Sequence, residues 1–278
     1  IRPSHRCVSG NRLLAALVGT VLSMTTPAPP SYDAIEHIRL DGTEFIRLVS
    51  EADPTLSVPT CPGWRLGDLT FHVARGWNYW AGVLSTGITS RNDVREILEI
   101  ERPPEHAGLI DVLFDAHVRL CDALHTADAS MKVWTWTGST QPVAWVARRM
   151  THETMVHLWD AGQAIGLDFE FGPAVSADGI DEWLTWFAAG ERAEGEMKVG
   201  GTVHLHCTDS ELPHGTGEWF VSAMKEPKAT FTREHRKGDA AIRGQAQDIL
   251  MWLWRRGSDV EVIGDKVVAR RFQAFTDL

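Results

Sequence analysis

Apolar residues recur at helical spacing over most of the first half of the chain. The strongest stripe lies within residues 65–84 and follows the i, i+3, i+7 pattern that is typical of the buried face of a helix. This stripe consists of Leu66, Leu69, Val73, Trp77, Trp80 and Leu84. Similar spacing predicts helices over 32–52, 108–125 and 142–165. Four helices of this length, joined by loops, predict an antiparallel four-helix bundle.

The pattern changes after Gly172 and Pro173, where shorter segments follow one another. We predict strands over 202–207, 218–223, 229–232 and 260–263, and helices over 178–189, 239–256 and 267–275. Helices and strands without regular alternation indicate an α+β domain. The predicted fold class is therefore α+β, with a helical bundle over residues 31–170 and a smaller C-terminal α+β domain over residues 171–278.

Residues 1–30 are expected to be a disordered or non-native extension and do not enter the fold prediction. Three arginines precede an apolar run from Leu13 to Leu22, which is the pattern of a signal peptide and is too short for a membrane span. A rival interpretation starts the natural chain at Met24, which is followed by a segment rich in proline. Both interpretations stay open at this point.

Charge and cysteine content exclude several classes of protein. The formal net charge of -10 argues against a nucleic-acid-binding protein. The four cysteines lie far apart with no CxxC pair, which excludes a disulfide framework and a thiolate zinc site. We therefore expect a cytoplasmic monomer or dimer that acts on small molecules, without nucleic-acid or membrane partners.

A carboxylate and an imidazole lie on the inward face of the helix predicted over 142–165. Glu153 and His157 are four residues apart, so their side chains lie one turn apart on one face. The other members of that stripe are apolar, and buried polar groups there are costly unless something satisfies them. A divalent metal would satisfy both groups, but pairing with each other or with Arg148 or Arg149 would do so as well. A metal site needs a third ligand from another segment.

Several segments resemble a known family. Residues 58–73 (VPTCPGWRLGDLTFHV) and 147–161 are similar to two signatures of the mycothiol-dependent maleylpyruvate isomerase-like proteins, which belong to the DinB-like metal-binding superfamily. Residues 203–209, 217–219 and 239–244 resemble the C-terminal domain of that family. The resemblance covers about residues 32 to 275, and motifs that match in both halves are more specific than any single motif.

The resemblance implies a DinB-like helical bundle that holds zinc, or another divalent metal, through His72, Glu153 and His157. His72 is followed one turn later by Gly76, which leaves open space beside the imidazole. Two imidazoles and one carboxylate leave a fourth coordination position vacant, as in catalytic zinc sites.

The resemblance also implies mycothiol as a thiol cosubstrate, because zinc would stabilise its thiolate as a nucleophile at neutral pH. It further implies that Arg243 is a catalytic residue that anchors the substrate or the cofactor. A guanidinium can bind a carboxylate through two hydrogen bonds. An alternative is that Arg243 lies at the start of a helix and pairs with Asp239.

Other candidate residues are open to structural interpretations. His204 and His206 share one face of a predicted strand and could chelate a metal, but no carboxylate or third histidine is obviously placed with them. We therefore favour an exposed or pocket-lining strand. Asp160 either orients a ligand imidazole or lies on the surface. Cys61 precedes Pro62 and Gly63, and a structural role is favoured over a reactive thiol.

These observations predict a zinc-dependent, mycothiol-using isomerase or S-transferase that acts on a small electrophilic substrate, such as a maleylpyruvate-like compound. One alternative is a metal-dependent hydrolase, in which the vacant position holds an activated water. Another is a non-catalytic protein that binds the thiol or the metal.

Overall fold

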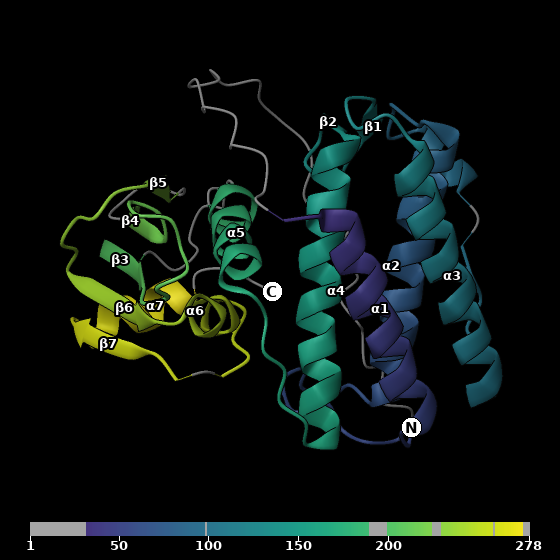
Figure 1. The fold of residues 1–278 in the computed structure, drawn as a ribbon, viewed down its shortest axis with the longest axis horizontal. Coiled ribbons are helices and arrows are strands. Elements are labelled where there is room, and N and C mark those ends of the chain that lie inside the picture. Colours follow the sequence, from purple (N-terminus) through teal and green to yellow (C-terminus); the bar gives the residue numbers. More distant parts are fainter. Residues whose placement is uncertain (1–31, 98, 189–198, 224–228, 258, 275–278) are drawn as a thin grey trace, which may run out of the picture.

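The computed structural model describes residues 32–97, 99–188, 199–223, 229–257 and 259–274. The extension expected over residues 1–30 lies outside the described residues. Helix and sheet segments together confirm the α+β class (Figure 1). No helix among the described residues combines the length and the apolar character that a bilayer span requires.

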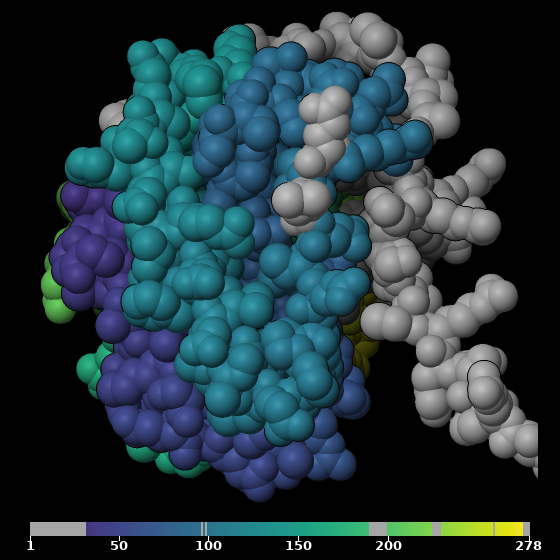
Figure 2. All heavy atoms as spheres, turned by 90° about the vertical axis from the view of Figure 1, so that its right-hand side faces the viewer, coloured from purple at the N-terminus to yellow at the C-terminus, as the bar shows by residue number. Residues whose placement is uncertain are grey.

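Four long helices pack side by side in the N-terminal half (Figure 1). They are α1 (Ala34–Glu51), α2 (Leu66–Thr86), α3 (His106–Thr126) and α4 (Val143–Ile165). Figure 2 shows the side of the molecule away from the sheet, where purple residues of α1 lie beside the blue to teal residues that include α3. Helices α2 and α4 each end at a glycine in the left-handed conformation, Gly87 (φ 64°) and Gly166 (φ 75°).

Short elements connect these helices. A 3-10 helix, η1 (Asp93–Glu96), lies between α2 and α3. The hairpin of β1 (Lys132–Trp134) and β2 (Thr140–Pro142) leads into α4. At the start of α2, the carboxylate of Asp68 accepts a hydrogen bond from the backbone N–H of Arg65 (2.9 Å). This is half of a capping box, because a guanidinium has no acceptor with which to complete it.

The C-terminal half contains a five-stranded sheet with the order β5-β4-β3-β6-β7. Its strands are β3 (Gly201–Cys207), β4 (Glu218–Ala223), β5 (Thr230–Thr232), β6 (Ala240–Gly244) and β7 (Glu261–Gly264). Strands β3 and β6 run parallel, whereas the other neighbours are antiparallel. The helices are α5 (Pro173–Trp183), continued by the π-helix η2 (Leu184–Ala188), α6 (Ala246–Leu253) and α7 (Lys266–Gln273).

The prediction of one continuous helix over 239–256 was wrong. Strand β6 occupies its first part and α6 its second part. Ala240 and Ile242 are buried while Arg243 is exposed, which is the two-residue period of a strand. The strand forms because β3 and β7 hydrogen-bond to its two edges, and these partners are distant in sequence. The helix predicted over 178–189 begins earlier, at Pro173, whose fixed φ suits the first helical position.

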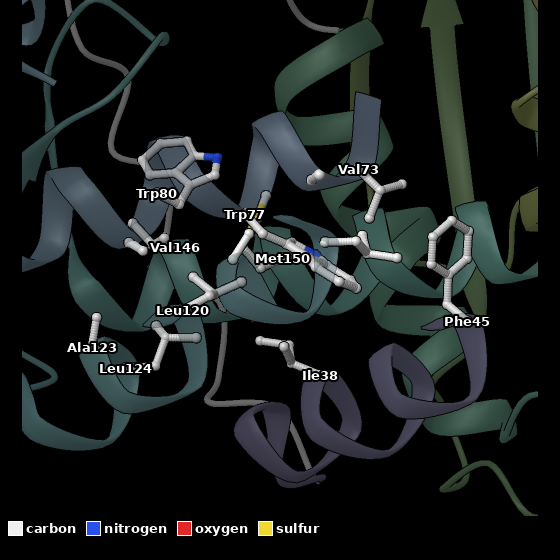
Figure 3. Packing of buried hydrophobic residues seen from close by; sticks show 14 of the residues in the cluster. Ile38, Phe45, Val73, Trp77, Trp80, Leu120, Ala123, Leu124, Val146 and Met150 are labelled. Atoms are coloured by element: carbon white, nitrogen blue, oxygen red, sulfur yellow. The ribbon is translucent and has the colours of Figure 1, made fainter. Parts of the chain in front are cut away.

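Two hydrophobic clusters form the core. Helices α1 to α4 contribute the first cluster, in which Trp77 is 1% exposed and lies among residues of all four helices (Figure 3). The second lies between the sheet and helices α5 to α7, and Val203, Leu205 and Ile242 belong to it. Because side chains alternate along a strand, His204 and His206 lie on the opposite face of the sheet. The boundary near residue 170 stays a prediction.

Buried ion pairs join the two halves along α4 and α5, which are neighbours in Figure 1. Arg148 Nε donates to Asp178 Oδ2 (2.8 Å), and His152 Nδ1 lies 2.7 Å from Glu182 Oε2. Arg149 also pairs with Glu182, and both side chains are almost fully buried. The orientation of α5 against α4 is therefore defined by directional polar contacts as well as by packing.

Candidate metal centre

The structure brings the three predicted metal ligands together. His72 comes from α2, and Glu153 and His157 come from successive turns of α4. Glu153 Oε1 lies 3.3 Å from His72 Nε2 and 3.1 Å from His157 Nε2. The two imidazole rings meet edge to face at 4.9 Å between centroids. The potential ligand atoms all lie within 4.8 Å of one another.

This arrangement fits a divalent cation. Nitrogen and oxygen ligands about 2.0–2.1 Å from a tetrahedral zinc ion are about 3.3 Å apart. The two separations from Glu153 Oε1, 3.3 Å and 3.1 Å, match that value. Two imidazoles and one carboxylate also suit zinc and other first-row divalent ions. Metal binding by these three residues nevertheless stays a prediction.

Asp160 holds the imidazole of His157 in place. His157 Nδ1 lies 2.9 Å from Asp160 Oδ2, which leaves Nε2 directed at the ligand cluster. Asp160 is fully buried and accepts hydrogen bonds from Thr60 Oγ1 (2.5 Å) and from Nη2 of Arg256 (2.8 Å). Burial raises the pKa of Asp160, but the contacts with His157 and Arg256 outweigh it and keep that pKa well below its usual range. The carboxylate is therefore charged and can orient the imidazole.

Arg149 performs a similar task for Glu153. Its Nη2 donates to Glu153 Oε2 at 2.8 Å, which leaves Oε1 facing both imidazoles. Burial raises the pKa of Glu153, but hydrogen bonds with His157 and His72 outweigh it and hold the pKa well below its usual range. Glu153 is thus a carboxylate in the folded protein.

The same contacts that lower the pKa of the two carboxylates raise the pKa of His157. Burial lowers the pKa of this imidazole, but its hydrogen bonds with Asp160 and Glu153 outweigh burial and raise the pKa to about 9. In the metal-free protein His157 is therefore protonated at neutral pH, and any metal bound through this imidazole would have to displace that proton.

We expect the metal-free protein to lose stability as pH rises from 6.5 to 8.5. Folded His157, with a pKa of about 9, keeps its proton over this range, whereas the unfolded imidazole, with a pKa of about 6.5, releases it. The contribution of His157 to the free energy of unfolding is therefore fully present below pH 6.5 and is lost as the pH rises towards 9. Between pH 6.5 and 8.5 this loss amounts to roughly 2 kcal/mol.

Urea unfolding after treatment with a chelator measures this slope. The pKa of His152 is also raised in the folded protein, so this residue too makes the protein less stable as pH rises. His157→Gln serves as the control, because it removes only the contribution of His157. An unchanged slope in this variant would contradict the assignment.

A cavity of about 560 Å³ adjoins the cluster. His72 and Glu153 lie in its wall, together with Gly76, at which an added Cβ would meet no atom within 4 Å. The space predicted beside His72 is therefore present. Most of the wall is apolar or aromatic, namely Tyr79, Trp80, Val94, Ile97, Ile100, Trp136, Met150, Phe187 and Trp254. Both halves of the chain contribute to it.

Arg243 is not brought to this centre. It lies on β6, its side chain is half exposed, and it pairs with Glu261 at 3.3 Å. It does not pair with Asp239, which accepts hydrogen bonds from Thr202. The cavity wall does not include Arg243. Its role as an anchor has no support from its position and stays a prediction.

Cys61 lies behind the centre, with Sγ 3.4 Å from Asp160 Oδ2. Burial and the Asp160 charge raise the pKa of this thiol to about 12, so it is protonated at neutral pH. An unreactive thiol agrees with the structural role that the sequence favoured.

Of the two supporting arginines, the sequence offered Arg149 as an alternative partner of Glu153, and it gave no indication of Arg256. Arg149 precedes Glu153 by one turn and pairs with it as that alternative expected, whereas the burial of Arg149 depends on α5 covering α4. Arg256 has no local signal, because it reaches Asp160 from the turn that follows α6. Phe187 and Trp254 complete the cavity from segments that sequence spacing cannot align with α2.

Comparisons with known proteins agree with this geometry. Residues 35–162 match the mycothiol maleylpyruvate isomerase N-terminal domain family, and residues 174–271 match the C-terminal domain of the same family. The fold is similar to solved structures of the mycothiol-dependent maleylpyruvate isomerase and of a mutant of that enzyme. Each has a TM-score of 0.55 and 18% sequence identity, with 83% of this chain and 91% of the other covered. No curated protein sequence matches the chain significantly.

Proposed function

Because the chain belongs to the mycothiol maleylpyruvate isomerase family, as matches to both of its domains show, we propose that it is a zinc-dependent, mycothiol-using isomerase or S-transferase. The observation that supports this proposal most directly is the convergence of His72, Glu153 and His157 beside a cavity. Helices α1 to α4 would form the DinB-like bundle that presents these ligands.

The proposal gives each polar residue of the centre a task. His72, Glu153 and His157 would hold the cation, which when bound lowers the pKa of a thiol and so supplies a nucleophile. Asp160 keeps the Nε2 atom of His157 directed at the ligand cluster. Arg149 keeps one oxygen of Glu153 directed at both imidazoles.

The cavity indicates what the substrate looks like. Its volume suits a small ligand, and its aromatic walls would bind an apolar body and exclude water. Arg149 and Arg75 are the arginines of the wall. Arg149 is already paired with two carboxylates, whereas Arg75 is exposed, with its guanidinium 5.9 Å from the centre of the Phe71 ring. We therefore propose that Arg75 binds a carboxylate of an electrophilic substrate.

Arg75→Met should raise KM for a carboxylate-bearing substrate roughly tenfold or more, because a hydrogen bond to a charged group contributes about 1.5–3 kcal/mol. Arg243→Met is the matched comparison, since it removes an equally long cation outside the cavity. Steady-state kinetics of both variants decide between the two anchors. A large effect at Arg243 alone would restore the anchor that the family resemblance implied.

A thiol-dependence assay tests the proposed function. Zinc-loaded protein is incubated with electrophiles, including maleylpyruvate, in the presence and absence of mycothiol. We expect isomerised or conjugated product only when both metal and thiol are present. A hydrolysed product that forms without any thiol would support the hydrolase alternative. Thiol binding without turnover of any electrophile would support a non-catalytic protein.

A further inference from the structure

A second group of potential metal ligands lies on the sheet, on the face away from α5 to α7. His204 and His206 come from β3, Glu218 from the adjacent β4, and His235 from the segment that follows β5. His206 and Glu218 are directly opposite each other in the register of β3 and β4. The carboxylate and third histidine that sequence spacing did not reveal are thus supplied by other segments.

The geometry of this second cluster is compact. Glu218 Oε2 lies 2.5 Å from His204 Nε2 and 2.8 Å from His235 Nδ1, and Glu218 Oε1 lies 3.1 Å from His206 Nδ1. The three rings lie 4.9–5.9 Å apart between centroids. One potential ligand atom from each residue lies within 4.8 Å of the others.

The neighbouring arginines have other partners and do not occupy the space between the four side chains. Arg243 is opposite His206 on the adjacent β6, but it pairs with Glu261. Arg236 lies over the ring of Phe220 at 4.3 Å. His235 is 72% exposed at its side chain, so one side of the cluster is open to solvent.

We propose that His204, His206, Glu218 and His235 form a second metal site, which binds a first-row divalent transition ion such as zinc. Three imidazoles and one carboxylate supply four ligands, which is a full tetrahedral shell. This differs from the three-ligand set around Glu153, which leaves a position for chemistry. The second site would therefore be structural and would link the segment after β5 to β3 and β4.

Metal stoichiometry tests this inference on the full chain, without reference to activity. We expect wild-type protein, stripped with a chelator and titrated with Co²⁺, to bind two equivalents. His72→Ala should retain the equivalent of the second site, with the visible absorption of tetrahedral Co²⁺. The double variant His206→Ala, His235→Ala should lose that equivalent and keep the other, with affinity at the second site reduced at least 100-fold.

His125→Ala, which removes an exposed histidine at the end of α3, is the control and should still bind two equivalents. The inference is overturned if His72→Ala binds no Co²⁺, or if the double variant still binds two equivalents. Circular dichroism is used to check that the double variant is folded. Because His72→Ala reports on the second site alone, failure of the proposed enzymatic function would not affect this result.

Discussion

His72→Ala should abolish thiol-dependent turnover while the protein remains folded. The change removes one of the three proposed ligand atoms, so the affinity for the metal should fall. Loss of a residue that only orients a metal ligand already lowers metal affinity or activity by about 10–100-fold. For loss of a ligand itself we expect a decrease of at least 100-fold. The side chain is 44% exposed, so its removal leaves no large buried void.

Turnover is measured in an assay with mycothiol, and bound metal is measured by mass spectrometry. His125→Ala is the matched control for both measurements. If turnover persists at more than one tenth of the wild-type rate, the assignment of this centre is wrong. Retention of metal at the second site does not affect the conclusion, because activity is the deciding measurement.

Glu182→Ala should reduce the free energy of unfolding by about 3–5 kcal/mol, which is the cost of removing one partner from a buried ion pair. Glu182 is 1% exposed and pairs with both Arg149 and His152. Its removal leaves two buried cationic groups with less compensation. Burial raises the pKa of Glu182, but Arg149 and His152 outweigh it and lower that pKa, so the native carboxylate is charged.

Urea denaturation at pH 7 measures this loss. Glu44→Ala is the comparison, because its exposed pair with Arg47 on α1 is expected to contribute less than about 1 kcal/mol. A loss below about 1 kcal/mol at Glu182 would show that the junction between α4 and α5 depends on packing rather than on charge.

The sequence was most informative where chemistry and periodicity lie in one segment. Helices α2 and α4 have long apolar stripes, so their bounds were predicted closely. The spacing of Glu153 and His157 followed directly from the helical repeat. His72 could be added only through the family resemblance, because no local rule relates a position on one helix to the facing position on another.

Features that depend on distant partners could not be predicted. Strand β6 contains alanine and arginine, which also suit a helix, and only its pairing with β3 and β7 decides the outcome. The contact of Arg149 with Glu182 depends on how α5 packs on α4. His235 joins His204 only because β5 pairs with β4 and directs the following segment back over β3.

The division of labour around the cavity has a consequence for protein engineering. All three proposed ligand atoms come from α2 and α4, whereas Phe187 and Trp254 line the cavity from the C-terminal half. Libraries randomised at these two aromatic positions leave the proposed ligands themselves unchanged, so they could be screened for new substrates. Grafting C-terminal halves from relatives onto this helical half would extend the same approach, provided that the graft keeps Arg256, which pairs with Asp160.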